Sequence, residues 1–173
     1  MKNKPAYKFI SALLLASVML FQMGCGTEEK TIEYNVTNLT KADDNFNVQI
    51  NVSSFFNLFT IHLSIYNKTQ TEMYYEPSRT ALLSNDAFVI HQLTSSEATQ
   101  LVSSEPYMDV NAQNTYSTID LYILRASYIP SGAGISGLLF YPLRLIRLPL
   151  TLRVEINGQQ YSFLINRIIK EEN

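Results

Sequence analysis

Cysteine, histidine and tryptophan are scarce in this sequence. Its 173 residues include one cysteine, two histidines and no tryptophan. A single cysteine excludes an internal disulfide framework and any zinc or iron–sulfur site that needs several cysteine ligands. Charged residues make up 16% of the chain and the formal net charge is -2, so we expect no nucleic-acid partner. The hydrophobic fraction of 46% excludes wholesale disorder and suits one small globular domain.

The first 24 residues have the pattern of a secretory signal peptide. Lys2, Lys4 and Lys8 precede an uncharged, mostly apolar run, Phe9–Phe21. This run is shorter than the ~20 residues that a membrane-spanning helix needs. A positive start followed by a short apolar core therefore predicts a signal peptide over residues 1–24.

The sole cysteine lies where this signal peptide would be cleaved. Gly24-Cys25 resembles the end of a lipobox, the motif of bacterial lipoprotein signal peptides. The resemblance implies that the thiol of Cys25 receives a diacylglycerol and that its amino group, once freed, takes a fatty acid such as palmitate. Two or more acyl chains hold a protein stably on a membrane. Gly26 after the cysteine implies outer-membrane sorting in a Gram-negative cell. The alternative is an ordinary signal peptide with an incidental cysteine.

Residues 25–44 are polar with little periodicity, so we predict a flexible tether there and a folded domain over 45–173. In that domain the apolar residues recur mainly with period two, which indicates half-buried strands. In the second strand, for example, one face carries Phe59, Ile61, Leu63 and Ile65. The other face carries the polar series His62, Ser64 and Tyr66. The predicted strands are Asn47–Val52, Phe59–Tyr66, Met73–Tyr75, Ala87–Leu93 and Tyr116–Arg125.

The C-terminal part predicts a β-hairpin with a defined register. Asn157-Gly158 lies between two alternating runs and suits a two-residue type I′ turn, in which both residues need positive φ. This turn would place three apolar pairs on one face of the hairpin. The pairs are Val154–Tyr161, Leu152–Phe163 and Leu150–Ile165.

One short helix is expected, over residues 95–102, with Thr94 or Ser95 as its N-cap. Many short strands with one connecting helix predict an all-β fold, an antiparallel β-sandwich. The runs FTIHLSIYNK at 59–68 and GLLFY at 137–141 resemble strands of the immunoglobulin-like sandwiches of small bacterial surface lipoproteins. The domain lacks the Cys…Trp…Cys core of antibody domains, and a shared architecture implies no activity.

The sequence offers few groups for catalysis or metal binding. His62 and His91 lie in strand patterns, and no serine sits in a G-x-S-x-G elbow, so we expect no enzyme. We expect no cofactor and no metal site either, because Asp43-Asp44-Asn45 and Asp109 lack EF-hand spacing. Ser131–Gly137 is glycine-rich but has no P-loop lysine, and we predict an inter-strand loop there.

Arginines and tyrosines are the remaining candidates for recognition. Arg144, Arg147 and Arg153 give the last third a positive balance, whereas residues 25–120 are acidic. These arginines could bind an anionic partner or simply pair with the acidic half. Several tyrosines could point outward and recognise protein or sugar, or lie at the rim of the core. They are Tyr66, Tyr74, Tyr75, Tyr116 and Tyr122.

Together these patterns predict a lipid-anchored bacterial envelope protein attached to the membrane through Cys25. Its non-catalytic β-sandwich would bind another envelope protein or a surface ligand through strand edges or loops. A carbohydrate-binding module is the first alternative, and an enzyme with an unrecognised site is the second. The sequence leaves the partner open.

Overall fold

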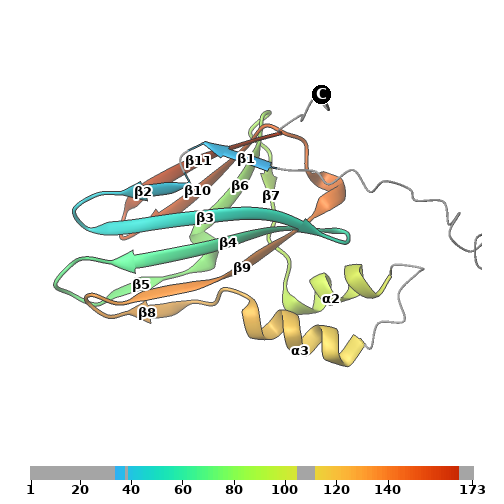
Figure 1. Ribbon diagram of the computed structural model, residues 1–173, viewed down its shortest axis with the longest axis horizontal. Coiled ribbons are helices and arrows are strands. Elements are labelled where there is room, and N and C mark those ends of the chain that lie inside the picture. Colours follow the sequence, from blue (N-terminus) through green and yellow to red (C-terminus); the bar gives the residue numbers. More distant parts are fainter. Residues whose placement is uncertain (1–33, 38, 105–111, 168–173) are drawn as a thin grey trace, which may run out of the picture. The chain divides into compact units, whose positions relative to one another are not determined.

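The computed structural model describes residues 34–37, 39–104 and 112–167. It confirms the predicted all-β antiparallel sandwich (Figure 1). One sheet has five strands in the order β1-β11-β10-β6-β7, and the other has four in the order β2-β3-β4-β9. A two-stranded sheet, β5-β8, completes the described strands.

The first sheet is formed by β1 (Tyr34–Thr37), β6 (Thr80–Ser84), β7 (Val89–Ile90), β10 (Leu150–Ile156) and β11 (Gln159–Arg167). The second is formed by β2 (Thr40–Ala42), β3 (Phe46–Phe55), β4 (Leu58–Asn67) and β9 (Gly134–Pro142). The other elements are β5 (Met73–Tyr75), β8 (Ser127–Ile129), the helices α2 (Ser95–Ser103) and α3 (Ala112–Tyr122), and two short 3₁₀ turns, η1 (Pro77–Arg79) and η2 (Leu143–Leu145).

The main core lies between the two large sheets. Alternating residues of β3, β4 and β9 meet alternating residues of β10 and β11, as the period-two pattern predicts. The largest fully buried side chains include Phe46, Phe59, Tyr141 and Phe163. Apolar burial on this scale is the main favourable contribution to the free energy of folding.

The predicted C-terminal hairpin is confirmed in turn and register. Asn157 and Gly158 have φ of 50° and 79°, as a type I′ turn requires. The strands pair Val154 with Tyr161, Leu152 with Phe163 and Leu150 with Ile165. All six side chains are buried, so turn chemistry and apolar pattern select the same register.

The helix predicted over residues 95–102 is confirmed as α2, which ends one residue later. Thr94 is its N-cap in a capping box. The Thr94 hydroxyl accepts from the Glu97 amide, and the Glu97 carboxylate accepts from the Thr94 amide at 2.8 Å.

The strand predicted over Tyr116–Arg125 is wrong, because most of this stretch belongs to a second helix, α3. A strand would place Ile119 and Leu121 on one face, but Ile119 is buried, whereas Leu121 is 74% exposed. Ile119 and Ile123 are instead one helical turn apart and pack in the same cluster. A short apolar run carries both periodicities, and contact with the neighbouring elements selects the helix.

Three further boundaries differ from the sequence expectations. Strands β1 and β2 lie within the predicted tether, residues 25–44, so regular structure is present before residue 45. The strand predicted over 87–93 shortens to β7, because Ala87 occupies a turn with φ of 61°. The loop predicted over 131–137 ends at Ala133, and β9 begins at Gly134 by pairing with β4.

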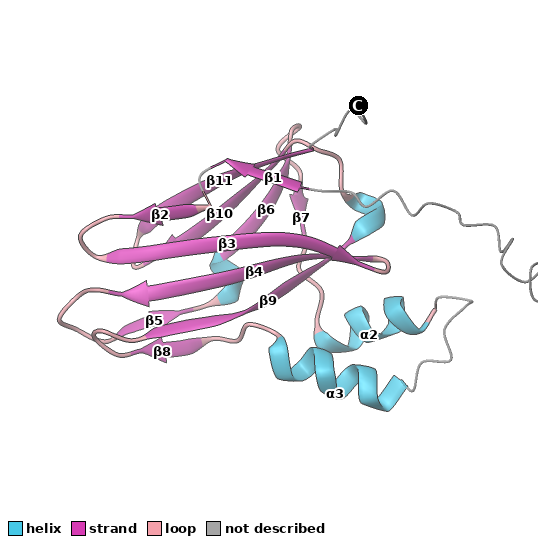
Figure 2. Cartoon of the chain, in the orientation of Figure 1, coloured by secondary structure: helices cyan, strands magenta, loops and turns pink. Residues whose placement is uncertain are grey.

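Helices α2 and α3 cover part of the outer face of the four-stranded sheet (Figure 2). They form a second apolar cluster with Leu58 of β4 and Phe140 of β9. After α3 the chain crosses the edge of β9. Ile123 packs on the helical side, Leu124 enters the main core, and the Leu124 amide donates to the Leu138 carbonyl at 2.9 Å.

This crossing requires a glycine at position 137. A Cβ on Gly137 would lie 2.8 Å from the Cα of Leu124. Because this Cα belongs to the backbone, no rotation of a side chain could relieve the clash. We therefore expect Gly137→Ala to lower the free energy of unfolding by about 1–3 kcal/mol, measured by urea denaturation. Ser162→Ala, at an exposed position of β11, is the control and should stay within ~0.5 kcal/mol of the parent protein. Equal stability of both variants would contradict this packing.

A hydrogen-bonded carboxylate joins the two large sheets at one end. The Tyr161 hydroxyl of β11 donates to Asp43 in the β2–β3 turn at 2.5 Å. The amides of Asn45 and Phe46 donate to the other oxygen of that carboxylate at 2.7 and 2.8 Å. Desolvation works to raise the pKa of Asp43, but the hydrogen bonds from Tyr161, Phe46 and Asn45 outweigh it and lower the pKa. Asp43 of the acidic stretch Asp43-Asp44-Asn45 therefore stabilises a turn.

This lowered pKa predicts a loss of stability in acid. The carboxylate stabilises the fold above the pKa of unfolded aspartate, about 3.9, and that contribution is lost as pH falls through the lower folded pKa. We expect Tyr161→Phe, which keeps the edge contact with Phe46, to unfold more easily by about 1.5 kcal/mol at pH 7. It should also show a shallower decline in unfolding free energy below about pH 4. The same decline in the parent and the variant would show that Asp43 does not depend on Tyr161.

Candidate ligand-binding face

The outer face of the four-stranded sheet is divided into a covered half and an open half. Leu58 and Phe140 lie in the covered half, beneath the helices. Beyond them, the outward positions of β3, β4 and β9 carry uncharged polar side chains and one tyrosine. We name this set the open polar face; it consists of Asn47, Gln49, Asn51, His62, Ser64, Tyr66 and Ser136.

Strand pairing fixes the rows of this face. Asn47 pairs with Tyr66, and Tyr66 pairs with Gly134. In the next row Gln49 pairs with Ser64, which pairs with Ser136. Adjacent strands lie about 4.8 Å apart, so each row places its side chains within reach of one small ligand. These residues line a hollow of about 290 Å³.

Tyr66 is the aromatic element of the face and is 45% exposed. A Cβ on Gly134 would lie 3.4 Å from the Tyr66 ring and 3.0 Å from the Ile65 carbonyl oxygen. The glycine therefore allows the tyrosine ring to lie close to the strand beside it. The exposed part of the ring remains available to a ligand.

Asn47 carries an unsatisfied acceptor next to this tyrosine. Its side-chain oxygen Oδ1 is buried and has no hydrogen-bond partner within the part of the chain that the structure describes. A buried acceptor without a donor costs free energy. Asn47 lines the hollow, so a small turn of its side chain would bring this oxygen to a ligand hydroxyl or amide that supplies the missing donor.

His62 and Ser136 make a long contact across the sheet. The ring nitrogen Nε2 of His62 lies 3.4 Å from the Ser136 hydroxyl, and the pair is exposed. His91, the other histidine, is exposed beyond β7, so the fold does not place the two in one cluster. Among the described residues, no group of three or more histidine, cysteine or acidic side chains is arranged to hold a metal ion.

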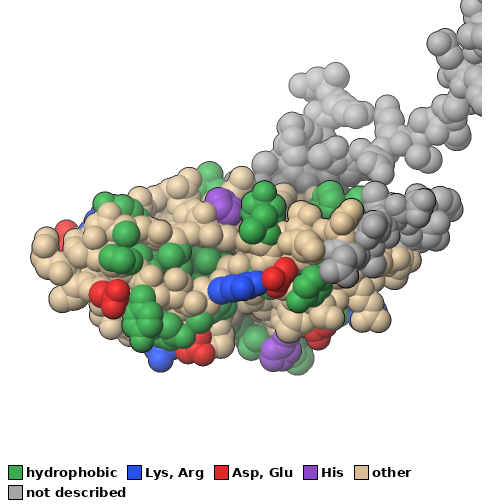
Figure 3. Space-filling model, turned by 90° about the horizontal axis from the view of Figure 1, so that it is seen from below, with side chains coloured by type: hydrophobic (Ala, Val, Ile, Leu, Met, Phe, Trp, Pro, Cys, Tyr) green, Lys and Arg blue, Asp and Glu red, His purple; other side chains and the backbone are tan. Residues whose placement is uncertain are grey.

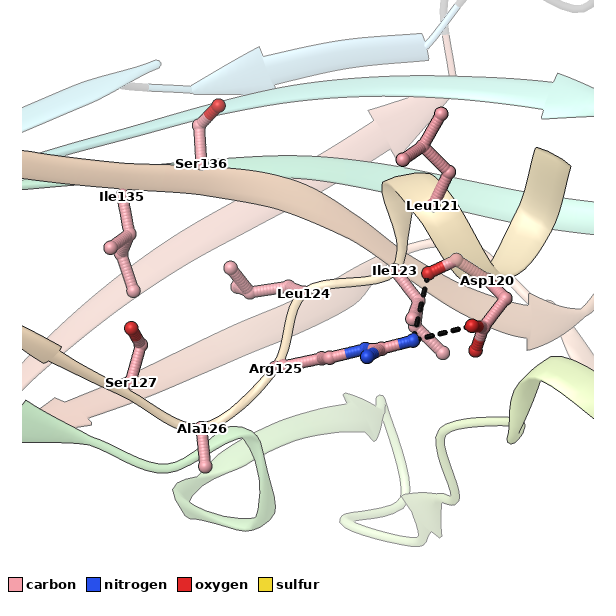
Figure 4. Close-up of a pocket in the computed structure, with 9 residues that line it drawn as sticks. All are labelled: Asp120, Leu121, Ile123, Leu124, Arg125, Ala126, Ser127, Ile135 and Ser136. Carbon is pink, nitrogen blue, oxygen red and sulfur yellow. Dashed lines mark hydrogen bonds and ion pairs between the residues drawn. The ribbon is translucent and has the colours of Figure 1, made fainter. Parts of the chain in front are cut away.

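A second hollow, of about 540 Å³, adjoins the open polar face along β9. Ile135 and Ser136 line both hollows. Figure 4 shows Arg125 extended toward Asp120, with Ser127 at the start of β8. Arg125 Nη2 lies 2.6 Å from Asp120 Oδ2 and donates to the Asp120 carbonyl at 3.1 Å. This pair gives the second hollow no uncompensated charge.

Asp120 is held by a second donor as well. The Ser95 hydroxyl donates to Asp120 Oδ1 at 2.8 Å, joining the start of α2 to α3. This hydrogen bond, together with the one from Arg125, lowers the pKa of Asp120. The carboxylate therefore stays ionised at neutral pH and links the two helices.

Figure 3 shows the side of the molecule with β8, β9 and α3, where charged side chains are few among neutral ones.

The predicted recognition residues separate in the structure. Tyr66, Tyr74, Tyr116 and Tyr122 are exposed, whereas Tyr75 is buried and shares a 2.7 Å hydrogen bond with Thr80. Arg144, Arg147 and Arg153 are exposed, and none forms an ion pair with another described residue. Cys25 and Asp109 lie outside the described residues.

Part of the open polar face follows from the sequence pattern and part does not. The alternation in β3 and β4 put the polar series of both strands on one side. Gly134 and Ser136 were missed, because their glycine-rich surroundings predicted a loop. The signal for Ser136 was its two-residue spacing from the outward residue Leu138 of the same strand.

No protein-family model and no curated protein sequence matches the chain. Two solved structures are similar to it. The yjhA protein from Bacillus subtilis covers 66% of this chain and 76% of its own, with 14% identity and a TM-score of 0.45. A "putative lipoprotein (ycdA)" from Bacillus subtilis covers 75% of this chain, with 14% identity and a TM-score of 0.49. This chain spans 39% of the ycdA chain. At such identity the similarity concerns the fold alone.

Within the described residues, no helix has the length and apolar character needed to cross a membrane.

Proposed function

We propose that this protein is a lipid-anchored protein of the bacterial cell envelope whose non-catalytic β-sandwich binds a neutral saccharide. Cys25 carries the lipid, and the open polar face carries the ligand. The observation on which the saccharide assignment rests is the combination of Tyr66 with the unpartnered oxygen of Asn47 in one hollow.

The composition of the open polar face supports a neutral ligand rich in hydroxyl groups. Amide, hydroxyl and imidazole side chains both donate and accept hydrogen bonds, which suits sugar hydroxyls that do the same. The face has no charged member, so an anionic or cationic ligand would find no countercharge there. The exposed ring of Tyr66 offers an apolar surface for the C–H face of a pyranose.

Binding rather than catalysis is proposed because the groups on this face are loosely arranged. A nucleophile needs a base within hydrogen-bond reach and a third group that orients the base. The contact between His62 and Ser136 is long and exposed. Within the described residues, His62 has no carboxylate hydrogen-bonded to it.

The anchor is supported by the sequence around Cys25. A positive start and the short apolar run Phe9–Phe21 precede Gly24-Cys25, and Cys25 is the chain's sole thiol. Lipid on this residue would leave the folded domain free of cysteine.

The saccharide proposal predicts that Tyr66→Ala weakens glycan binding. Titration of the mature, detergent-solubilised protein with neutral oligosaccharides selected on a glycan array should show a loss of about 1–1.5 kcal/mol, up to about tenfold in Kd. Tyr74→Ala removes a tyrosine of β5 that is 51% exposed and is the matched control. Asn47→Ala should also weaken binding without lowering the thermal midpoint, because it removes an unsatisfied buried oxygen. No binding to any neutral glycan, or equal effects of both tyrosine variants, would refute the proposal.

The anchor predicts that Cys25→Ser abolishes lipid attachment and moves the protein out of the membrane fraction. Metabolic labelling with a fatty acid, followed by fractionation, measures both. Ser11→Ala lies in the apolar run and should leave labelling unchanged. A labelled and membrane-bound Cys25→Ser protein would show that another feature holds it.

A further inference from the structure

One end of the sandwich is where the chain enters the fold. In the five-stranded sheet a single row of paired residues crosses four strands near this end, and Tyr34 lies two residues beyond it. The row consists of Val36, Ile165, Leu150 and Ser84.

The other sheet contributes its own end row to the same end. Phe55 pairs with Leu58, which pairs with Pro142. Residues 143–149 connect Pro142 directly to Leu150 of the first sheet. The hairpin between β3 and β4, the turn η2 and the start of β1 therefore share one end (Figure 1).

This end exposes several large apolar side chains. Phe55 at the tip of the β3–β4 hairpin is 58% exposed and makes an edge contact with Phe56, with ring centroids 4.1 Å apart. Phe88, in the turn between β6 and β7, is 72% exposed. Leu145 of η2 is half-exposed and lines a hollow of about 450 Å³ together with Phe88 and Val89. Exposed apolar groups gathered in this way mark an interaction site.

The hairpin turn does not itself explain the phenylalanines. Phe56 has φ of 50°, a left-handed conformation that favours glycine or asparagine and is costly for a bulky residue. The Asn57 carbonyl accepts from the Leu143 amide at 2.8 Å, so the turn is held against η2. An aromatic pair displayed on a strained turn is best explained by contact with something outside the domain.

Two arginines accompany this apolar surface. Arg144 and Arg147 are exposed, and neither forms an ion pair within the described part of the chain. Arg147 Nη1 donates to the carbonyls of Arg144 and Ile146 at 3.2 and 3.1 Å, which holds its guanidinium beside η2. Asp86 and Glu97 line the nearby hollow, so the end carries both signs of charge.

We propose that this end rests on the surface of a lipid bilayer. The membrane-facing end consists of Phe55, Phe56, Phe88, Val89, Arg144, Leu145 and Arg147. Aromatic and aliphatic side chains enter the boundary between headgroups and acyl chains, while arginine side chains reach lipid phosphates. This inference rests on the proposed lipid at Cys25.

The length of the chain identifies the bilayer as the occupant. Cys25 and Tyr34 are nine residues apart, and nine residues reach at most about 30 Å. Tyr34 lies at the same end as the exposed apolar residues. A lipid on Cys25 would keep this end close to the bilayer, where a second, weak contact becomes effectively intramolecular.

Tryptophan fluorescence can test this contact, because the chain contains no tryptophan. Phe55→Trp and Phe88→Trp place one reporter each at the membrane-facing end. Tyr128→Trp places a control reporter at an exposed position of β8. Each lipidated full-length mature protein is reconstituted into vesicles of phosphatidylcholine and phosphatidylglycerol that carry doxyl-labelled acyl chains. We expect several-fold stronger quenching at positions 55 and 88 than at position 128.

A second pair of variants tests the arginines. Arg144→Ala with Arg147→Ala in the Phe88→Trp protein should reduce the quenching several-fold, whereas Arg153→Ala should leave it unchanged. Equal quenching at positions 55, 88 and 128 in vesicle-bound protein would overturn docking while leaving the anchor intact. A blue shift at position 88 without lipid quenching would also overturn it and would indicate a protein contact. Protein that fails to remain with the vesicles would refute the anchor itself.

Discussion

The fold depends on the shared use of β4 and β9 by two apolar clusters. On one face, Ile61 and Leu139 pack into the main core between the sheets. On the other face, Leu58 and Phe140 pack beneath α2 and α3. The helices end part-way along the strands, so the same outer face is apolar at one end and polar at the other. That change of character defines both the covered half and the open polar face.

Two tight features keep this division in place. Gly137 allows Leu124 to cross the edge of β9 and reach the main core. The Ser95–Asp120–Arg125 contacts join the start of α2 to the end of α3. Together they hold the end of α3 against α2 and β9, where the helical cover of the sheet ends. They also leave Ser136 at the boundary between the two hollows.

Much of the fold could be predicted where local chemistry and apolar pattern agree. The Asn157-Gly158 turn set the register of β10 and β11, and the Thr94–Glu97 box set the start of α2. The region around α3 could not be predicted, because Ile119 and Ile123 fit two periods over so short a stretch. The helical choice depends on Leu58, Ala98 and Phe140, which lie elsewhere in the sequence. Similarly, β1 finds its partner in β11 at the other end of the chain.

The open polar face was predictable in orientation but not in extent. Alternation placed His62, Ser64 and Tyr66 opposite the core, and the structure agrees. Alternation cannot show which outward positions a helix will cover, since Thr60 has the same parity and is buried. The unpartnered oxygen of Asn47 is likewise invisible in sequence, because the partners of a side chain depend on which groups the fold brings beside it.

The direction of the strands separates the two proposed contacts. Leu58 begins β4 at the end where the chain enters, and Tyr66 lies eight residues further along, about 27 Å away at the rise of an antiparallel strand. If Cys25 carries a lipid as proposed, the open polar face would thus lie well beyond the lipid headgroups, in the aqueous layer. There, neutral hydrogen-bonding groups are suited to hydroxyl-rich ligands. The membrane-facing end would lie at the boundary between headgroups and acyl chains, which suits its aromatic side chains and arginines. The β3–β4 pair thus carries part of the membrane-facing end at its hairpin and part of the open polar face at its other end.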